Sequence, residues 1–285
     1  MRMSQLPVRA KKRLGQHFLV DKEVLATIVE TAGLTLGSRV LEIGPGLGVL
    51  TAALGKAVGP EGLVLAVEAD RDLVDKLRER FHSKSQVKIV AGDILATPLD
   101  ELLQTPYTIV ANIPYSITSP VITKFLLGDY KGRAGTPSPR PESMTMLVQQ
   151  EVAERLAAKP GTRDRGLLTV LIELFGTATL VRTVPPTAFE PPPKVHSAVI
   201  HITLGEPKVN PWAFLMLLKA GFANKRRQFH NSLSGSLHLG TNQTKELLEQ
   251  AGIESSMRAE ELTIDQWLAL FALVRPNPPV GGDEH

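Results

Sequence analysis

The sequence predicts an α/β fold in which a mainly parallel sheet carries helices on its faces, followed by a small all-helical domain. Three observations lead to this prediction. From residue 39 onward, short apolar runs alternate with segments whose apolar residues recur at helical spacing, which is typical of parallel strands joined by helices. A glycine-rich turn follows the first of these runs. Beyond about residue 206, only helical periodicity remains.

The first part of the sheet is predicted from a regular alternation of strands and helices. The ranges, in order, are 39–43 (strand), 47–58 (helix), 63–68 (strand), 71–81 (helix) and 87–91 (strand). The helix at 71–81 places its apolar residues on one stripe and its charged residues elsewhere, as expected for a surface helix that packs on a sheet. This stretch therefore supplies the first three strands.

The remaining strands are predicted to follow as far as residue 204. Strands are expected at 107–111, 144–148, 177–184 and 195–204, with helices at 119–127, 151–158 and 166–174. Ser119 and Pro120 suit the N-cap and the first position of a helix. Residues 128–143 contain several glycines and prolines, so we expect a surface loop there and no domain boundary. The sheet thus resumes after this loop.

A stiff connection is predicted between the last two strands. Residues 185–193 include five prolines, which fix the backbone and remove N–H donors. We therefore expect no ladder of hydrogen bonds in this segment.

The C-terminal part is predicted to be helical. Helices are expected at 212–222, 243–251 and 264–274, the last with a capping box formed by Thr263 and Gln266. With 285 residues, the chain has room for one large domain and a small one. We place the boundary between a first domain at 1–205 and a helical domain at 206–285.

Charge and composition narrow the classes of function. The net charge is only +3, but basic residues are clustered near the N-terminus and at Lys225, Arg226 and Arg227, which favours a polyanionic partner. The chain has no cysteine, which excludes disulfides, thiolate metal sites and cysteine nucleophiles. No apolar run approaches the ~20 residues of a membrane span. We expect a soluble, cytoplasmic protein that needs no metal.

The glycine-rich turn and the strand that follows it predict a binding site for a nucleoside. Gly44, Gly46 and Gly48 follow a buried strand and open a helix, so their backbone can approach a ligand closely. A dinucleotide fingerprint would need a third glycine at Val49, so a pyrophosphate cradle is disfavoured. Glu68 ends the next strand, where it can accept ribose hydroxyls, as in both dinucleotide and S-adenosylmethionine enzymes.

Two further strand ends carry polar residues that suit recognition of adenine. Asp93 follows the strand at 87–91, where its carboxylate can accept a hydrogen bond from an adenine amine. Asn112 opens the sequence Asn112-Ile113-Pro114-Tyr115 at the end of the next strand. The Asn112 side-chain oxygen and the Pro114 carbonyl can accept the two hydrogens of an adenine N6 amine, which frees its lone pair to attack a sulfonium methyl. Tyr115 offers a face for stacking worth ~1–3 kcal/mol, so we expect an unpaired or flipped adenine.

At these residues the sequence closely resembles the ribosomal RNA adenine dimethyltransferases, which dimethylate two adjacent adenosines near the 3′ end of small-subunit rRNA. The resemblance covers nearly the whole chain. The matching stretches are 14–19, 42–48, Glu68, Asp93, 112–115, 150–155, 189–195, 223–227 and 258–262.

This resemblance implies a Rossmann-like class I methyltransferase fold, with a seven-stranded, mainly parallel sheet and a helical C-terminal domain. It also implies roles at the cofactor S-adenosylmethionine: His17 and Leu19 border it, and the other residues hold its parts. Gly44, in the turn that also includes Gly46, is expected to contact the methionine part of the cofactor. Glu68 is expected to bind its ribose and Asp93 its adenine. Asn112 is expected to lie beside both the cofactor and the target amine.

The resemblance implies two further features of the substrate side. Phe189 is expected as a second aromatic wall opposite Tyr115, and the Lys225–Arg227 cluster as a contact to rRNA phosphates. Many family members have Asn where this chain has His17, whose imidazole can still donate one hydrogen bond. The expected partner is the immature small ribosomal subunit, bound by a monomer.

Three alternatives remain open. A macrolide-resistance methyltransferase shares the fold and a similar Asn-Ile-Pro-Tyr motif but modifies large-subunit rRNA; 189–195 and the Asn-Lys-Arg-Arg segment favour the small-subunit enzyme. A ribosome assembly factor with dispensable catalysis is a second alternative. A DNA adenine methyltransferase is the third, but such enzymes typically have Pro at the position of Ile113 and an added base-reading domain.

Overall fold

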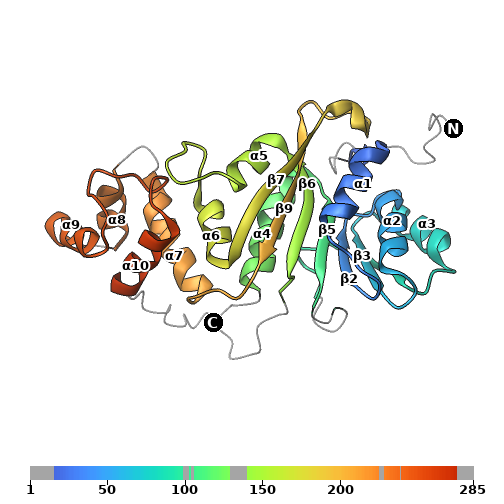
Figure 1. The fold of residues 1–285 in the computed structure, drawn as a ribbon, viewed down its shortest axis with the longest axis horizontal. Helices are drawn as coiled ribbons and strands as arrows, with labels where there is room; N and C mark the ends of the chain where they lie inside the picture. The colour runs from blue at the N-terminus through green and yellow to red at the C-terminus, as the bar shows by residue number, and fades with distance from the viewer. Residues whose placement is uncertain are drawn as a thin grey trace, which may run out of the picture. The chain divides into compact units, whose positions relative to one another are not determined.

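The computed structural model describes residues 16–98, 103, 106–128, 140–224, 228–237 and 239–274. The chain divides into two compact units, the first made of 1–125, 138–153 and 179–202, the second of 126–137, 154–178 and 203–285. This division cuts the chain differently from the boundary predicted at residue 205, because residues 154–178 group with the C-terminal helices. Figure 1 shows the order of elements along the chain.

A seven-stranded sheet forms the centre of the fold, with the strand order β4-β3-β2-β5-β6-β9-β7. The register is parallel between β3 and β4, between β2 and β3, between β2 and β5 and between β5 and β6. The strands are β2 (Arg39–Ile43), β3 (Leu63–Glu68), β4 (Val87–Ala91), β5 (Thr108–Asn112), β6 (Ser143–Gln149), β7 (Gly176–Val184) and β9 (Ser197–Leu204). The predicted class of fold is thus confirmed, and each predicted strand is present within two residues of its expected ends.

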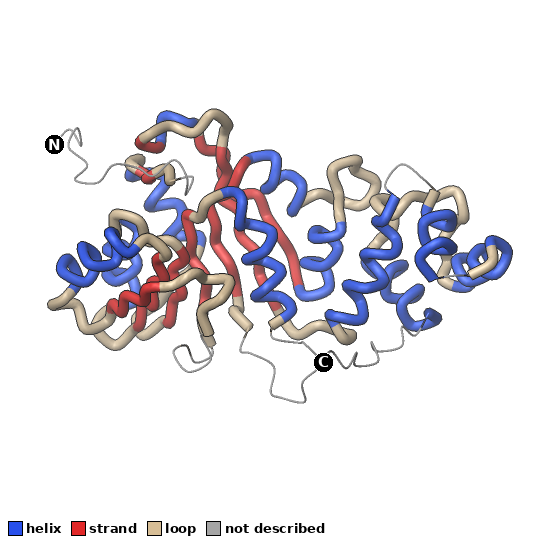
Figure 2. The backbone as a smooth tube through the Cα atoms, turned by 180° about the vertical axis from the view of Figure 1, so that it is seen from behind, coloured by secondary structure: helices blue, strands red, loops and turns tan. Residues whose placement is uncertain are grey.

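The buried strands explain why the sheet forms. Along β2 and β3 nearly every residue is buried, as expected for parallel strands covered on both faces. The helices that flank them are α2 (Val49–Val58) and α3 (Arg71–Phe81). Helix α4 (Thr118–Leu127) lies over the sheet in the view from behind, shown in Figure 2. The apolar stripe predicted for α3 is buried along its whole length.

The N-terminal helix α1 (Lys22–Thr31) was not predicted from the sequence. Its signal was the N-cap residue Asp21, whose carboxylate accepts hydrogen bonds from the main-chain N–H groups of Glu23 (2.8 Å) and Val24 (3.1 Å). Val24 and Ile28 are fully buried and pack with the sheet. Helix α1 therefore anchors the segment that precedes it, which includes His17.

A second, two-stranded sheet corrects the expectation for the proline-rich segment. Strand β1 (Phe18–Leu19) pairs antiparallel with β8 (Phe189–Glu190). The prediction of no ladder there was wrong, because Phe189 and Glu190 lie between prolines and keep their own N–H groups. The segments around residues 18 and 190, far apart in sequence, are thereby joined.

The second unit is built from helices. They are α6 (Leu167–Phe175), α7 (Pro211–Gly221), α8 (Phe229–Leu237), α9 (Thr241–Gln250) and α10 (Ile264–Val274). Trp267 of α10 is fully buried, stacked on Phe222 and edge-on to Phe229. Helix α8 was missed from the sequence because its serines and Gly235 have low helix propensity; it is stabilised by burial of Phe229 and Leu233.

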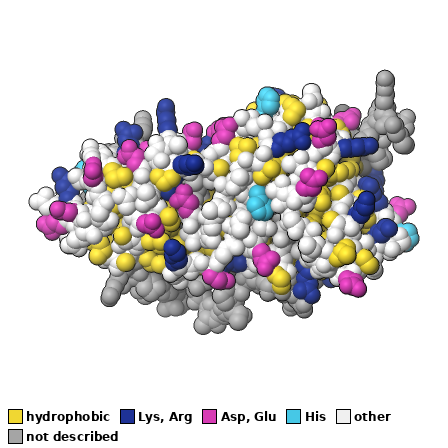
Figure 3. Space-filling view, viewed as in Figure 1, with side chains coloured by type: hydrophobic (Ala, Val, Ile, Leu, Met, Phe, Trp, Pro, Cys, Tyr) yellow, Lys and Arg dark blue, Asp and Glu magenta, His cyan; other side chains and the backbone are white. Residues whose placement is uncertain are grey.

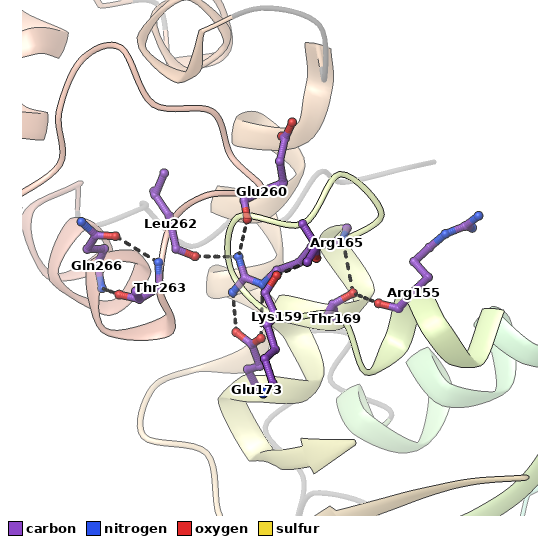
Figure 4. A network of polar contacts seen from close by, with 11 residues as sticks. Arg155, Lys159, Arg165, Thr169, Glu173, Glu260, Leu262, Thr263 and Gln266 are labelled. Atoms are coloured by element: carbon purple, nitrogen blue, oxygen red, sulfur yellow. Dashed lines mark hydrogen bonds and ion pairs between the residues drawn. The ribbon is translucent and has the colours of Figure 1, made fainter. Parts of the chain in front are cut away.

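A fully buried arginine ties the segment before α6 to the segment before α10. The guanidinium of Arg165 donates to both carboxylate oxygens of Glu173, at 3.2 and 2.5 Å, and to the main-chain carbonyls of Leu262 (2.6 Å) and Glu260 (3.3 Å). Figure 4 shows these contacts converging on one side chain. Pairing and hydrogen bonding on this scale offset the cost of burying the charge.

Candidate active site

A cavity of about 500 Å³ opens at the carboxyl ends of β2, β3, β4 and β5. Ligand sites in α/β sheets lie at this edge. The structure brings together nine residues that the sequence singled out, from five separate segments. They are His17, Leu19, Gly44, Gly46, Glu68, Asp93, Asn112, Pro114 and Tyr115.

The glycine turn after β2 forms the floor of this cavity. Gly46 has a φ of 59°, a left-handed conformation that favours glycine. Its N–H donates a 3.0 Å hydrogen bond to Oε2 of Glu68. A Cβ added at Gly46 would lie 3.3 Å from the Phe18 ring, so a larger residue here would press on β1.

Glu68 is held by main-chain donors at the end of β3. Its Oε1 accepts from the N–H of Asp70 at 2.9 Å, while its Oε2 accepts from Gly46. Burial raises the pKa of the Glu68 carboxyl, and these N–H groups oppose the rise. Each carboxylate oxygen keeps a further lone pair, so Glu68 can still accept hydrogen bonds from a ribose.

Asp93 is placed differently, on an exposed position after β4. Its Oδ1 accepts a hydrogen bond from the N–H of Leu95 at 2.9 Å. This bond orients the carboxylate at the cavity wall, and Oδ2 can accept from an adenine amine.

Glu42 is a cavity residue whose role the sequence did not reveal. It lies in β2 and is only 1% exposed, yet it belongs to the cavity lining. Neither carboxylate oxygen has a hydrogen-bond partner among the described residues. The available signal was an acidic residue inside an otherwise apolar buried strand, which is rare without a partner or a function.

The cavity wall carries acidic side chains. Glu42, Glu68 and Asp93 line it, and no Lys or Arg is found among the described lining residues. Such a wall suits a cationic nucleoside and disfavours a pyrophosphate, which needs positive charge or a cradle of N–H donors. These acidic residues therefore fit S-adenosylmethionine, which carries a sulfonium and an ammonium group.

Asn112 lies at the end of β5, beside the N-terminal segment. Its side-chain Nδ2 donates to the His17 carbonyl at 3.4 Å, which leaves Oδ1 able to accept from a bound amine. The Pro114 carbonyl, expected to accept the second amine hydrogen, already accepts from the N–H of Ile117 at 3.1 Å. A carbonyl has two lone pairs, so this turn bond occupies only one of them.

Tyr115 begins the short 3₁₀ helix η2 (Tyr115–Ile117) and lines the cavity. Its hydroxyl lies 2.6 Å from Oγ of Ser197, at the start of β9. Burial raises the pKa of the Tyr115 phenol, and the Ser197 contact partly opposes this. The ring is thereby fixed at the cavity wall.

Phe189 does not lie where the resemblance places it. It is 3% exposed, packs in the hydrophobic cluster with Leu19 and Val24, and is not among the cavity-lining residues. Pairing of β8 with β1 directs this ring into the core. In this conformation it forms no wall opposite Tyr115, and its role at the substrate stays a prediction.

The ring of His17 lies beside that of Tyr115. The two ring centroids are 6.3 Å apart, with an angle of 20° between the planes. The Nδ1–H of His17 donates to the Pro191 carbonyl at 2.7 Å. His17 thus links the cavity to the proline-rich segment. Many family members have Asn at this position.

The predicted phosphate contacts lie outside the described residues. These are Lys225, Arg226, Arg227 and the basic N-terminal residues before 16. On the face drawn in Figure 3, basic and acidic side chains are interspersed. The described part of the chain has no group of His, Asp and Glu suited to a metal. No helix within it is long and apolar enough to cross a membrane.

Comparison with known proteins identifies a family and close relatives. The model of the ribosomal RNA adenine dimethylase family matches residues 8–275. A ribosomal RNA small subunit methyltransferase A of Dehalococcoides mccartyi is 40% identical, covering 97% of this chain and 92% of its own. A protein of the same name from Thermosynechococcus vestitus is 42% identical, covering 94% and 98%.

Two solved structures have the same fold over most of their length. The 23S rRNA methyltransferase ErmE is 27% identical with a TM-score of 0.68, covering 90% of this chain and 99% of its own. A dimethyladenosine transferase from Plasmodium falciparum is 24% identical with a TM-score of 0.74, covering 90% and 96%.

Proposed function

The chain belongs to the ribosomal RNA adenine dimethylase family, and from this membership we propose that its target is the pair of adjacent adenosines in a hairpin loop near the 3′ end of 16S rRNA. It is an S-adenosylmethionine-dependent enzyme that methylates adenine N6 in ribosomal RNA. The small-subunit target is supported by relatives about 40% identical that carry that name. A role in small-subunit biogenesis follows from this target.

The observation that supports the proposal most strongly is that the cofactor-binding residues and the adenine-binding residues line one cavity. An acid-lined cavity suited to a cationic nucleoside and the Asn112–Tyr115 turn border the same opening. We assign Glu68 to the ribose, Asp93 to the adenine, and the Gly44–Gly46 turn to the methionine part of the cofactor, with His17 and Leu19 at its edge. S-adenosylmethionine supplies the methyl group when bound.

The remaining residues act on the target adenine. Asn112 Oδ1 and the Pro114 carbonyl accept the two N6 hydrogens, which holds the amine with its lone pair free. Tyr115 stacks on the base, with its hydroxyl fixed by Ser197. Phe189 closes the other face once its ring leaves the core. No strong general base is needed, because the proton departs after the methyl has been transferred.

RNA recognition is assigned to the C-terminal part of the chain. Lys225, Arg226 and Arg227 contact rRNA phosphates, with 1–205 as the catalytic domain and 206–285 as the RNA-binding domain. We propose that the protein acts as a monomer on the immature small subunit in the cytoplasm. The salt dependence of binding tests the phosphate contacts, since each one lost lowers the slope of log affinity against log salt by about one.

Large-subunit rRNA is the alternative target, favoured by the similarity to ErmE. The deciding experiment incubates the protein and S-adenosylmethionine with unmethylated small subunits and, separately, with large subunits and naked large-subunit rRNA, followed by mass spectrometry of the RNA. N6,N6-dimethyladenosine at paired sites near the small-subunit 3′ end is expected. Modification only of large-subunit RNA would replace the proposed target.

Catalysis and binding are separated with an Asn112→Ala variant. This variant removes the amine acceptor, so no dimethyladenosine is expected in the same assay. If it nevertheless cured the growth defect of a strain lacking the gene, rRNA binding would be the essential role and methylation dispensable.

A further inference from the structure

Glu42 is a buried acid that the assignments above leave without a role. It lies in the middle of the sheet, paired with Ala66 of β3 and Val110 of β5. Its carboxyl is 1% exposed, and both oxygens lack a hydrogen-bond partner among the described residues. The same is true of the hydroxyl of Thr51, on α2. Buried polar atoms are rarely left unpaired in a native protein without a reason.

The protonation state of this group in the free protein follows from its surroundings. Burial raises the pKa of the Glu42 carboxyl to about 8, and the negative charge of Glu68 adds to the rise. Thr51 lies near enough to offset part of it, although neither Glu42 oxygen is in hydrogen-bonding geometry with it. At neutral pH Glu42 is therefore mainly protonated before a ligand binds.

The other titratable groups that line the cavity are two further acids, one histidine and one tyrosine. Glu68, Asp93 and His17 line it from β3, the end of β4 and the N-terminal segment, and Asp70 lies just beyond Glu68. No Lys or Arg is among the described lining residues. Apart from Thr51, a cation that enters the cavity is thus the partner available to stabilise an ionised Glu42 in the described part of the site.

We propose that Glu42 is a proton-coupled counter-charge for the methyl donor, neutral in the free protein and ionised when the cationic end of S-adenosylmethionine occupies the cavity. The proton leaves to the solvent, so binding exchanges H⁺ for the ligand cation beside the carboxylate. This inference rests on the proposed function for the identity of the donor. It predicts that donor affinity rises with pH until Glu42 is ionised in the free protein, near pH 8, and is constant above it.

The donor carries two cationic groups, and the product of methyl transfer keeps only one. S-adenosylmethionine has a sulfonium and an ammonium, whereas S-adenosylhomocysteine has the ammonium alone. If Glu42 faces the sulfonium, its proton is released only by the donor and returns when the product forms, which favours product release. If it faces the ammonium, both ligands release the proton.

The test counts protons by titration calorimetry of the wild-type protein at pH 7, in two buffers with different ionisation enthalpies. A group with a pKa of about 8 is about 90% protonated at pH 7, so S-adenosylmethionine is expected to release close to one proton. Release with the donor alone assigns Glu42 to the sulfonium, and release with both ligands assigns it to the ammonium. Binding without proton release overturns the inference.

A Glu42→Gln variant assigns the released proton to this residue. The substitution preserves the shape of the neutral acid, so folding is expected to be retained, as thermal unfolding checks. The variant should bind the donor without releasing a proton, and its affinity should not change between pH 6 and pH 8, where wild-type affinity rises about tenfold or more. Undiminished proton release from the variant would overturn the assignment.

A matched control keeps the carboxyl and removes its neighbour. Thr51→Val deletes the hydroxyl that offsets part of the pKa rise, so proton release on donor binding should persist at pH 7. Failure of the wild-type protein to bind S-adenosylmethionine at all would count against the proposed function. Binding with no change in bound protons would count against the role of Glu42 alone.

Discussion

The hydroxyl of Tyr115 lies 2.6 Å from the hydroxyl of Ser197, which is fully buried at the start of β9. The bond joins the turn after β5 to the end of the proline-rich segment, two parts of the chain 82 residues apart. It fixes the ring that we assign to the target base, because the phenol cannot rotate away without losing a buried partner. This pairing could not be predicted, since Ser197 belongs to no recognisable motif of its own.

The first prediction concerns Tyr115. Tyr115→Ala should lower kcat/KM for rRNA about 5–150-fold, which corresponds to the ~1–3 kcal/mol of base stacking. The Kd for S-adenosylmethionine should change by less than about threefold, since stacking involves the target base. Steady-state kinetics and donor titration measure the two quantities. Tyr115→Phe is the control: it keeps the ring but loses the bond to Ser197, so its activity should fall less than that of Tyr115→Ala. Equal losses for RNA and donor would contradict the assigned role.

The second prediction concerns stability and pH. The pKa of Glu42 is about 8 in the folded protein and ordinarily 4.5, so the folded state holds this proton more tightly than the unfolded chain. The resulting stabilisation is complete below pH 4.5 and is lost as the pH rises towards 8. Between these two pH values, the free energy of unfolding of the wild type should fall with rising pH more steeply than that of Glu42→Gln. The difference in slope should reach up to ~1.4 kcal/mol per pH unit.

Urea denaturation of both proteins at pH 5.5 and 7.5, without ligand, measures this difference. Burial also raises the pKa of Glu68, but both proteins contain that residue, so its effect largely cancels in the comparison. Parallel pH dependence of the two proteins would show that Glu42 is not held protonated by the fold.

The third prediction concerns the buried arginine in Figure 4. Arg165→Met should lower the free energy of unfolding by about 3–5 kcal/mol, because it leaves Glu173 and two main-chain carbonyls without their donor. Arg182 provides a matched control, since its ion pair with Glu23 is exposed, and Arg182→Met should cost less than about 1 kcal/mol. Chemical denaturation measures both, and similar losses would contradict a special role for Arg165.

Most of the sheet could be predicted because its strands and helices have distinct periodicities. The buried runs of β2 and β3 and the stripe of α3 depend on local sequence alone. Helix α8 could not be predicted, since burial of Phe229 against Trp267 overrides a sequence with poor helix propensity.

The candidate site was predicted unevenly for a related physical reason. Glu68, Asp93 and Asn112 were found because the ends of parallel strands meet at one edge of a sheet. Glu42 was assigned no role, since the lack of a hydrogen-bond partner at its carboxyl depends on tertiary packing and not on the sequence of β2 alone. The burial of Phe189 was also missed, because the pairing of β1 with β8 joins segments more than 150 residues apart.

The last prediction concerns Gly46. A side chain at its φ of 59° strains the backbone by ~1–2 kcal/mol, and the added Cβ of Gly46→Ala would also press on the Phe18 ring at 3.3 Å. The strain displaces the N–H that donates to Glu68, and Phe18 is part of β1 at the cavity wall. We therefore expect donor affinity to fall at least about tenfold, in addition to the loss of stability.

Gly33 offers a control with nearly the same backbone strain and no cavity contact. Its φ is 61°, and a Cβ added there meets nothing within 4 Å. Gly33→Ala should lower the melting temperature through the same backbone strain, but less than Gly46→Ala, which adds the contact with the Phe18 ring. It should leave the Kd for S-adenosylmethionine unchanged. Donor titration and thermal unfolding of the two variants separate these effects. Equal donor affinities would mean that the turn at Gly46 does not shape the cofactor site, and the placement of the methionine part there would have to be abandoned.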